Sequence, residues 1–86
     1  MNAIQFDRVG RAEVMELREV HTPELRPGTV LVKNHVIAIN YGNTFFLRGT
    51  YLVKPRFPDT PGMEASGVIA AVAPDVKTLK TGMRVA

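Results

Sequence analysis

One short polar stretch, residues 40–48, holds most of the side chains that could do chemistry. It reads NYGNTFFLR and contains the densest group of polar residues in the chain: Asn40, Tyr41, Asn43, Thr44 and Arg48. Binding residues often lie where one element gives way to the next, as a strand gives way to a turn or helix here. Asparagines also cap helices and tolerate turn geometry, and from composition alone this capping role is favoured.

The segment PGMEASG, residues 61–67, contains Met63 and Glu64 as neighbours in the sequence. If Glu64 points inward it needs a partner, with an arginine as the natural candidate, because an unpaired buried carboxylate is costly. An outward orientation carries about equal weight. Met63 offers only a thioether, which is a poor ligand for Zn²⁺.

Motifs for metals and phosphates are missing from this sequence. It contains no cysteine, which excludes thiolate nucleophiles, disulfides and cysteine-based zinc sites. His21 and His35 have no acidic residue at a recognised ligand spacing, so a structural role is favoured for both. There is no G-x-G-x-x-G and no P-loop pattern, so a nucleotide would be held mostly by something else. We assign no metal ligand.

The composition excludes several kinds of partner. Eighty-six residues make one small domain. The net charge is +3, but the eleven Lys and Arg residues are spread among eight acidic ones, which favours a solvated surface over a nucleic-acid patch. No segment has the length of a signal peptide's apolar region or of a membrane span. We expect a cytoplasmic protein with no nucleic-acid or membrane partner.

Strands are the main elements that must position these side chains. Alternation predicts a hairpin from residues 1–6 and 13–20. Residues 29–40 are rich in β-branched side chains and predict the strongest strand, which is long enough for a central position. One short helical turn is expected within residues 40–49, with Gly49 as its stop.

The second half of the chain predicts a loop followed by two strands. Three prolines make residues 50–61 an extended loop. Residues 67–73 predict a buried strand, and Met83 to Ala86 begin a further strand for which we expect no partner. A domain that ends on the first residues of a new strand is expected to be cut short.

In this order and spacing, six segments resemble the N-terminal GroES-like part of the medium-chain dehydrogenase/reductase superfamily. They are MNAIQF, EVMELREV, PELRPGTVLVKNHVIAIN, NYGNTFFLRGTY, PGMEASGVI and LKTGMRVA. Within the superfamily, the chain is most similar to the zinc-independent quinone oxidoreductase branch, the ζ-crystallin-like reductases. The resemblance implies a mainly β fold over residues 1–86, an incomplete GroES-like β-barrel with one short helical turn. The Rossmann cofactor domain of the family is absent from this chain.

This resemblance implies a hydride transfer from NADPH to a quinone or to an α,β-unsaturated carbonyl such as an enal. In the family's zinc alcohol dehydrogenases a histidine stands where this chain has Met63, so the resemblance implies a site without zinc. The residues that bind the NADPH phosphates lie elsewhere in the family. We therefore expect the isolated chain to be inactive.

Site residues follow from the same resemblance. It implies catalytic roles for Asn40, Asn43 and Tyr51, and cofactor contacts for Asn40, Tyr41, Arg48 and Met63. Asn43 replaces the usual Asp, and Arg48 lies one place beyond the usual Arg. Phe45 replaces a Tyr that is a proposed proton donor, so Tyr41, Tyr51 or solvent would take that role.

Two other functions remain open. The first is an enoyl-thioester reductase segment, which NYGN at residues 40–43 slightly favours. The second is a stand-alone GroES-like binding or assembly module, which would need a closed fold. An OB-like nucleic-acid barrel ranks last, because the aromatic residues cluster in a turn instead of alternating with Lys and Arg on strands. Exposed strand edges would also favour a homodimer formed by strand addition.

Overall fold

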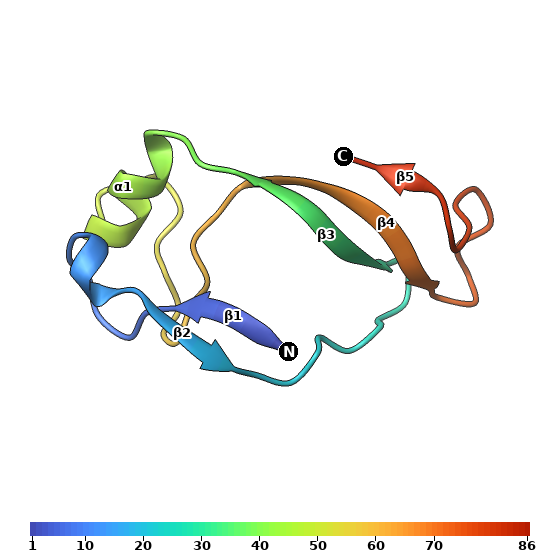
Figure 1. The fold of residues 1–86 in the computed structure, drawn as a ribbon, viewed down its shortest axis with the longest axis horizontal. Helices are drawn as coiled ribbons and strands as arrows, with labels where there is room; N and C mark the ends of the chain where they lie inside the picture. Colours follow the sequence, from blue (N-terminus) through green and yellow to red (C-terminus); the bar gives the residue numbers. More distant parts are fainter. The chain divides into compact units, whose positions relative to one another are not determined.

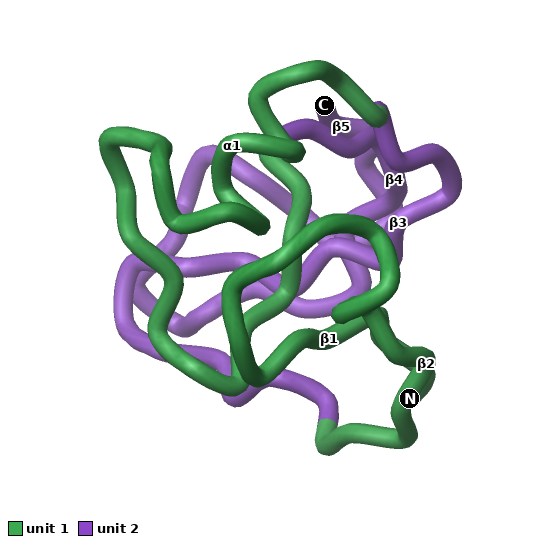
Figure 2. The backbone as a smooth tube through the Cα atoms, turned by 90° about the vertical axis from the view of Figure 1, so that its left-hand side faces the viewer, with its two compact units in different colours: residues 1–21, 39–63 green, residues 22–38, 64–86 purple.

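The computed structural model describes residues 1–86, which form two compact units (Figure 2). Unit 1 comprises residues 1–21 and 39–63, and unit 2 comprises residues 22–38 and 64–86. Each unit has its own sheet (Figure 1): β1 (Asn2–Gln5) and β2 (Glu16–Glu19) in unit 1, and β3 (Val30–Ala38), β4 (Glu64–Val72) and β5 (Arg84–Val85) in unit 2. The mainly β fold with one α-helix is confirmed. The barrel is not confirmed, because the strands form two separate sheets.

In unit 1, β1 and β2 form the predicted antiparallel hairpin. Asn2 lies opposite Glu19, and Gln5 lies opposite Glu16. The second strand is shorter than predicted, because its first residues belong to a 3₁₀ helix, η1 (Ala12–Val14). This 3₁₀ turn buries the Val14 side chain, which is 3% exposed.

The core of unit 1 is built around one aromatic ring. Phe6 is fully buried and meets the rings of Phe46 and Phe57 edge to face, with centroids 5.7 Å and 5.5 Å away. Val14 and Leu47 complete this core. Each such side chain stabilises the fold by about 1.5–3 kcal/mol when buried. The loop that follows the helix also binds the backbone of Phe6, because Phe6 and Asp59 exchange two N–H···O hydrogen bonds of 2.9 and 3.1 Å.

In unit 2, β4 is the central strand of the antiparallel sheet. This corrects two predictions. The β3 strand lies at the edge and not at the centre, and the last strand does have a partner, because β5 pairs with β4 through Gly67↔Val85 and Val68↔Arg84. The two segments contain six apolar residues each, so composition alone does not tell the central strand from the edge strand.

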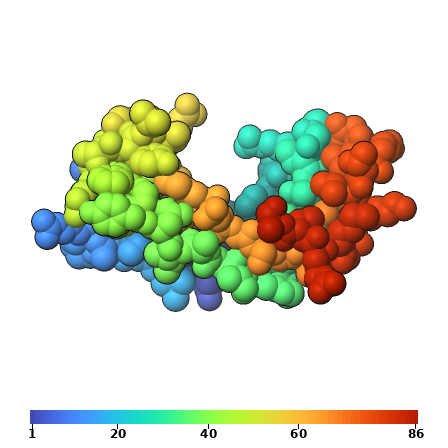
Figure 3. Space-filling model, turned by 90° about the horizontal axis from the view of Figure 1, so that it is seen from above, coloured from blue at the N-terminus to red at the C-terminus, as the bar shows by residue number.

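The β4 strand also begins earlier than predicted, at Glu64. Glu64 is exposed, so the outward orientation is the one observed. Ile69 and Ala73 are buried at about 1% exposure and form the core of this unit. Figure 3 shows the segment around residues 22–30 beside the turn that follows β4, where the Gly28 N–H donates to Asp75 Oδ1 at 3.0 Å.

Candidate functional site

The site begins at helix α1 (Gly42–Arg48), which confirms the predicted helical turn. At its start, the Asn40 N–H donates to Asn43 Oδ1 at 2.9 Å. It ends at Gly49, whose φ of 72° is accessible to glycine at little cost and whose N–H donates to the carbonyls of Phe45 and Phe46. The N-cap residue is Tyr41, and no side chain makes a cap hydrogen bond there, so capping by asparagine is not observed. Asn43 instead accepts from the backbone of Asn40, just before the helix.

Three of the predicted site residues converge on Gly42. A Cβ placed on this glycine would lie 3.2 Å from Asn40 Oδ1, 3.5 Å from Tyr51 Cε1 and 3.6 Å from Met63 Cε. All four residues belong to unit 1. An amide oxygen, the edge of a phenol ring and a thioether methyl therefore surround one bare α-carbon. We call these four residues the Gly42 cluster.

Asn43 adds an unused hydrogen-bond donor next to the Gly42 cluster. Its side-chain oxygen is engaged by the Asn40 N–H, whereas its Nδ2 is buried and has no acceptor in the structure. Buried donors without a partner are few in native proteins, and leaving one unpaired costs about 1–3 kcal/mol. This amide is the one buried side-chain donor that the fold leaves without an acceptor.

The side chains of Tyr41 and Arg48, two further predicted cofactor contacts, are both exposed. The Tyr41 side chain is 73% exposed, and its ring meets Phe45 edge to face at 5.1 Å. Arg48 is exposed in the last turn of α1. Seven helical residues span about 10 Å, so Arg48 lies at the opposite end of the helix from Asn40. The structure thus brings Asn40, Tyr51 and Met63 together at Gly42. It places Arg48 at the far end of the helix and leaves the Tyr41 side chain exposed.

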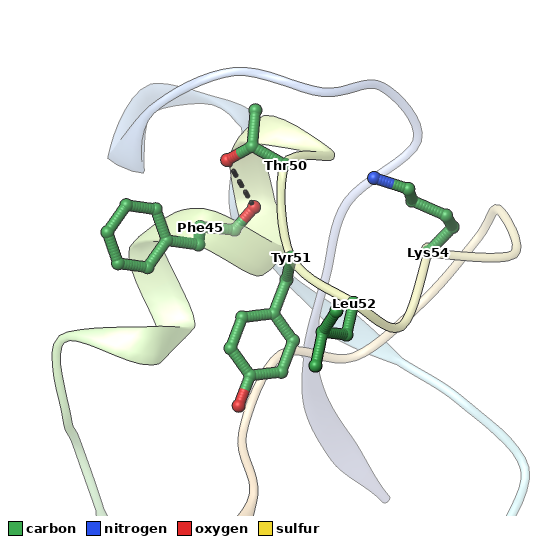
Figure 4. A pocket seen from close by; sticks show the side chains of 5 residues that line it. All are labelled: Phe45, Thr50, Tyr51, Leu52 and Lys54. Atoms are coloured by element: carbon green, nitrogen blue, oxygen red, sulfur yellow. Dashed lines mark hydrogen bonds between the residues drawn. The ribbon is translucent and has the colours of Figure 1, made fainter.

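A pocket of about 480 Å³ lies beside the cluster (Figure 4) and is lined by Phe45, Thr50, Tyr51, Leu52 and Lys54. Tyr51 belongs to both the pocket and the cluster. In Figure 4 the ring of Tyr51 and the side chain of Leu52 lie next to each other, and Thr50 Oγ1 donates to the Phe45 carbonyl at 3.4 Å. Lys54 Nζ donates to the Gly49 carbonyl at 2.8 Å.

Most of these lining residues were not predicted from the sequence, which gave no role to Thr50, Leu52 or Lys54. Phe45 was considered only as a replacement for a tyrosine. Leu52 is 95% exposed, and an apolar residue in a proline-rich loop with no periodicity carries no signal of its own. The one available signal was that LRGTYLV places three apolar or aromatic side chains, residues 51–53, shortly after the helix stop Gly49.

Charged groups with perturbed titration lie on the hairpin and its loop and not in the site. Arg18 donates to both carboxylate oxygens of Asp7 and also to Glu16. The hydrogen bond from Arg18 lowers the pKa of Asp7 from its usual value. Backbone N–H groups, its own first and then that of Arg11, lower the pKa of Glu13.

Neither a metal site nor a membrane span is found in the structure. No group of three or more His, Cys, Asp or Glu side chains is arranged to hold a metal ion. His21 and His35 are both exposed. No helix has the length and apolar character that crossing a bilayer requires.

Comparison with known proteins now decides the family. Residues 26–86 match the model of the alcohol dehydrogenase GroES-like domain. The chain belongs to this family. Over 86 residues it is 37% identical to the quinone oxidoreductase of Sus scrofa, a match that covers 99% of this chain and 26% of that relative. It is 36% identical over 73 residues to an alcohol dehydrogenase of Geobacillus stearothermophilus, covering 85% of this chain and 22% of that enzyme.

Solved structures agree with this assignment. The Escherichia coli quinone oxidoreductase complexed with NADPH matches 98% of this GroES-like chain with a TM-score of 0.90 and 31% identity, and the match covers 26% of that enzyme. An NAD-dependent alcohol dehydrogenase matches with a TM-score of 0.89 and 30% identity, covering 98% of this chain and 24% of that one. The resemblance to the medium-chain dehydrogenase/reductase superfamily is confirmed. The chain spans about a quarter of the length of these relatives.

Proposed function

We propose that this chain is the N-terminal part of a zinc-independent, NADPH-dependent oxidoreductase that reduces quinones or α,β-unsaturated carbonyls by hydride transfer. The observation that carries the proposal is the convergence of Asn40, Tyr51 and Met63 on Gly42. Its support from known proteins is the similarity to quinone oxidoreductases, one of which was solved in complex with NADPH.

The residues present fit a nicotinamide group. Asn40 would offer its side-chain amide to the carboxamide of such a group, and Asn43 holds the Asn40 backbone through Oδ1. The Asn40 amide oxygen and the Met63 methyl meet close to Gly42, so a polar and an apolar contact lie next to each other. Ligand sites commonly combine apolar walls with a few placed polar groups in this way. When bound, NADPH supplies the hydride.

Within this account, the protein's residues orient and shield the reacting groups. The Asn40 N–H donates to Asn43 Oδ1, and this hydrogen bond fixes the Asn40 backbone. The Asn40 side-chain oxygen lies beside Gly42. Met63 is 43% exposed and supplies an apolar contact. Its sulfur is a poor substitute for an imidazole as a zinc ligand, so we propose that the site works without zinc.

Reduction of a carbonyl or quinone oxygen also requires a proton. Phe45 has no hydroxyl. Tyr51 places its ring edge beside Gly42 and its side chain in the wall of the neighbouring pocket, whereas the Tyr41 side chain is 73% exposed. We therefore propose the Tyr51 hydroxyl as the general acid that donates this proton. In Figure 4 the Tyr51 hydroxyl points away from Thr50 and Lys54, so neither residue holds it.

The proposal is tested by measuring turnover in the full-length protein. NADPH oxidation is followed with a quinone, an enal and an enoyl thioester, before and after dialysis against a chelator, with NADH as the comparison. We expect the quinone or the enal to be reduced at a rate that the chelator leaves unchanged. Preference for the thioester would favour an enoyl-thioester reductase, and no turnover with any of them would favour a binding module.

A further inference from the structure

We propose that Gly42 is a positioning residue of this site, an inference that rests on the proposed function. Its missing side chain is what allows Asn40, Tyr51 and Met63 to lie around one point. Gly42 itself touches neither substrate nor cofactor in this account. Its role is to leave space for the side-chain amide of Asn40.

Backbone conformation does not explain a glycine at this position. Four glycines of the chain have a positive φ, namely Gly28, Gly49, Gly62 and Gly82, and Gly42 is not among them. It is the first residue of α1, where alanine is the better helix former because glycine loses more conformational freedom on folding. A local preference for alanine that the sequence does not follow indicates a spatial reason.

The distances show how little space there is. A Cβ at 3.2 Å from Asn40 Oδ1 would force that oxygen to move by a few tenths of an ångström, whereas the two carbon contacts of 3.5 and 3.6 Å are ordinary. A single methyl group therefore displaces mainly the Asn40 amide. A valine adds two further carbon atoms, and these must push Tyr51 or Met63 away as well. The effect of substitution should grow in steps from alanine to valine.

Stability and activity should respond in opposite directions. Gly42→Ala improves the helix, so the melting temperature should stay the same or rise. Activity should fall, because a reacting group misplaced by about 1 Å can lose about a hundredfold in rate. We expect about a tenfold loss of kcat/KM in Gly42→Ala and about a hundredfold loss in Gly42→Val, on the same scale.

The kinetic test uses the full-length protein and a glycine control. Gly28 lies in unit 2, has a φ of 76° and has nothing within 4 Å of a Cβ placed on it. Gly28→Ala should therefore lower the melting temperature through backbone strain and leave kcat/KM unchanged. The inference is supported if Gly42→Ala shows the reverse pattern. It is overturned if Gly42→Val keeps the kcat/KM of the unsubstituted protein.

A second readout does not depend on turnover. In the 86-residue chain, the side-chain amide resonances of Asn40 should shift in Gly42→Ala and shift further in Gly42→Val, while those of Asn2 stay in place. Unmoved Asn40 resonances in the valine variant would overturn the inference. If the unsubstituted protein reduces no quinone or enal, the proposed function fails, and these resonances still decide whether Gly42 positions Asn40.

Discussion

Tyr51 connects the two parts of the site at the scale of single residues. Its ring edge borders Gly42, and its side chain also forms a wall of the neighbouring pocket. Phe45, on the helix, stands where the family resemblance places a phenol and cannot supply a proton. The proposed proton transfer thus depends on the Tyr51 hydroxyl, which the loop after the helix contributes.

Removing that hydroxyl should slow reduction without weakening the fold. General acids contribute about 10²–10⁴-fold to rate, so Tyr51→Phe should lower kcat at least about a hundredfold. The ring is kept, and so is its contact with Gly42, so the melting temperature should not change. Steady-state kinetics with a quinone across a range of pH measures this effect. An unchanged kcat would mean that solvent supplies the proton.

A charged contact on the hairpin predicts a pH effect on stability. Arg18 holds the pKa of Asp7 below its usual value of 3.8. Because the folded-state pKa of Asp7 is the lower one, the Arg18–Asp7 pair stabilises fully above the unfolded-state pKa. That contribution is lost as the pH falls through the folded-state pKa. Arg18 stays charged throughout, so only the carboxyl group titrates.

The pKa of Asp7 can be measured by following its side-chain carboxyl carbon in an NMR titration. The midpoint should lie below that of a model aspartate, and it should rise toward the usual value in Arg18→Gln. The Glu13 carboxylate, whose pKa is lowered by backbone N–H groups and not by Arg18, serves as the internal control for the substitution. Equal Asp7 midpoints with and without Arg18 would refute the assignment.

At the scale of elements, one glycine controls how closely β3 and β4 approach. A Cβ on Gly67 would overlap the Lys33 carbonyl oxygen and would lie 2.9 Å from the Asn34 Cα. Both contacts are with backbone, which cannot move aside as a flexible side chain can. Gly67 is itself buried and pairs with Asn34, next to the register shift that leaves His35 as an extra residue.

Gly67→Ala should therefore destabilise the sheet. Overpacking of this kind costs about 1–3 kcal/mol, and here the clash with backbone predicts the upper part of that range. Urea unfolding of the chain measures the difference. Ala70→Ser is the matched control, because Ala70 lies exposed on the same strand and should change stability by less than about 0.5 kcal/mol. Equal losses in both variants would contradict this account of the strand pair.

Local patterns predicted those elements whose signals lie within the element itself. The hairpin, the β3 strand and the helix with its Gly49 stop follow from alternation, β-branched residues and capping. Pairing of β5 with β4 joins residues 67 and 85, and no local pattern indicates such a distant partner. The 3₁₀ turn at Ala12–Val14 was missed for a related reason, since burial of Val14 against Phe6 and Leu47 decides it.

At the scale of the whole molecule, the sequence indicated the site residues but not their grouping. Asn40, Tyr51 and Met63 come from three places in the chain, and only the fold brings them to Gly42. The resemblance gave no reason to separate them from Arg48, which lies at the far end of the helix, or from Tyr41, whose side chain is exposed. No sequence motif indicated Gly42, because the effect of its missing side chain depends on which residues surround it in the fold.

The same proximity gives the most direct test of the central claim, that a nicotinamide cofactor binds at the Gly42 cluster. The chain contains four methionines, Met1, Met15, Met63 and Met83, so methyl labelling yields four resolved reporters. Met63 borders Gly42, whereas Met83 lies in unit 2 with a similar exposure of 40% against 43%. The measurement is a methionine-methyl NMR titration of the chain with millimolar NADPH. The account predicts that the Met63 resonance shifts while Met83 stays in place, and a Met63 resonance that does not move would contradict it.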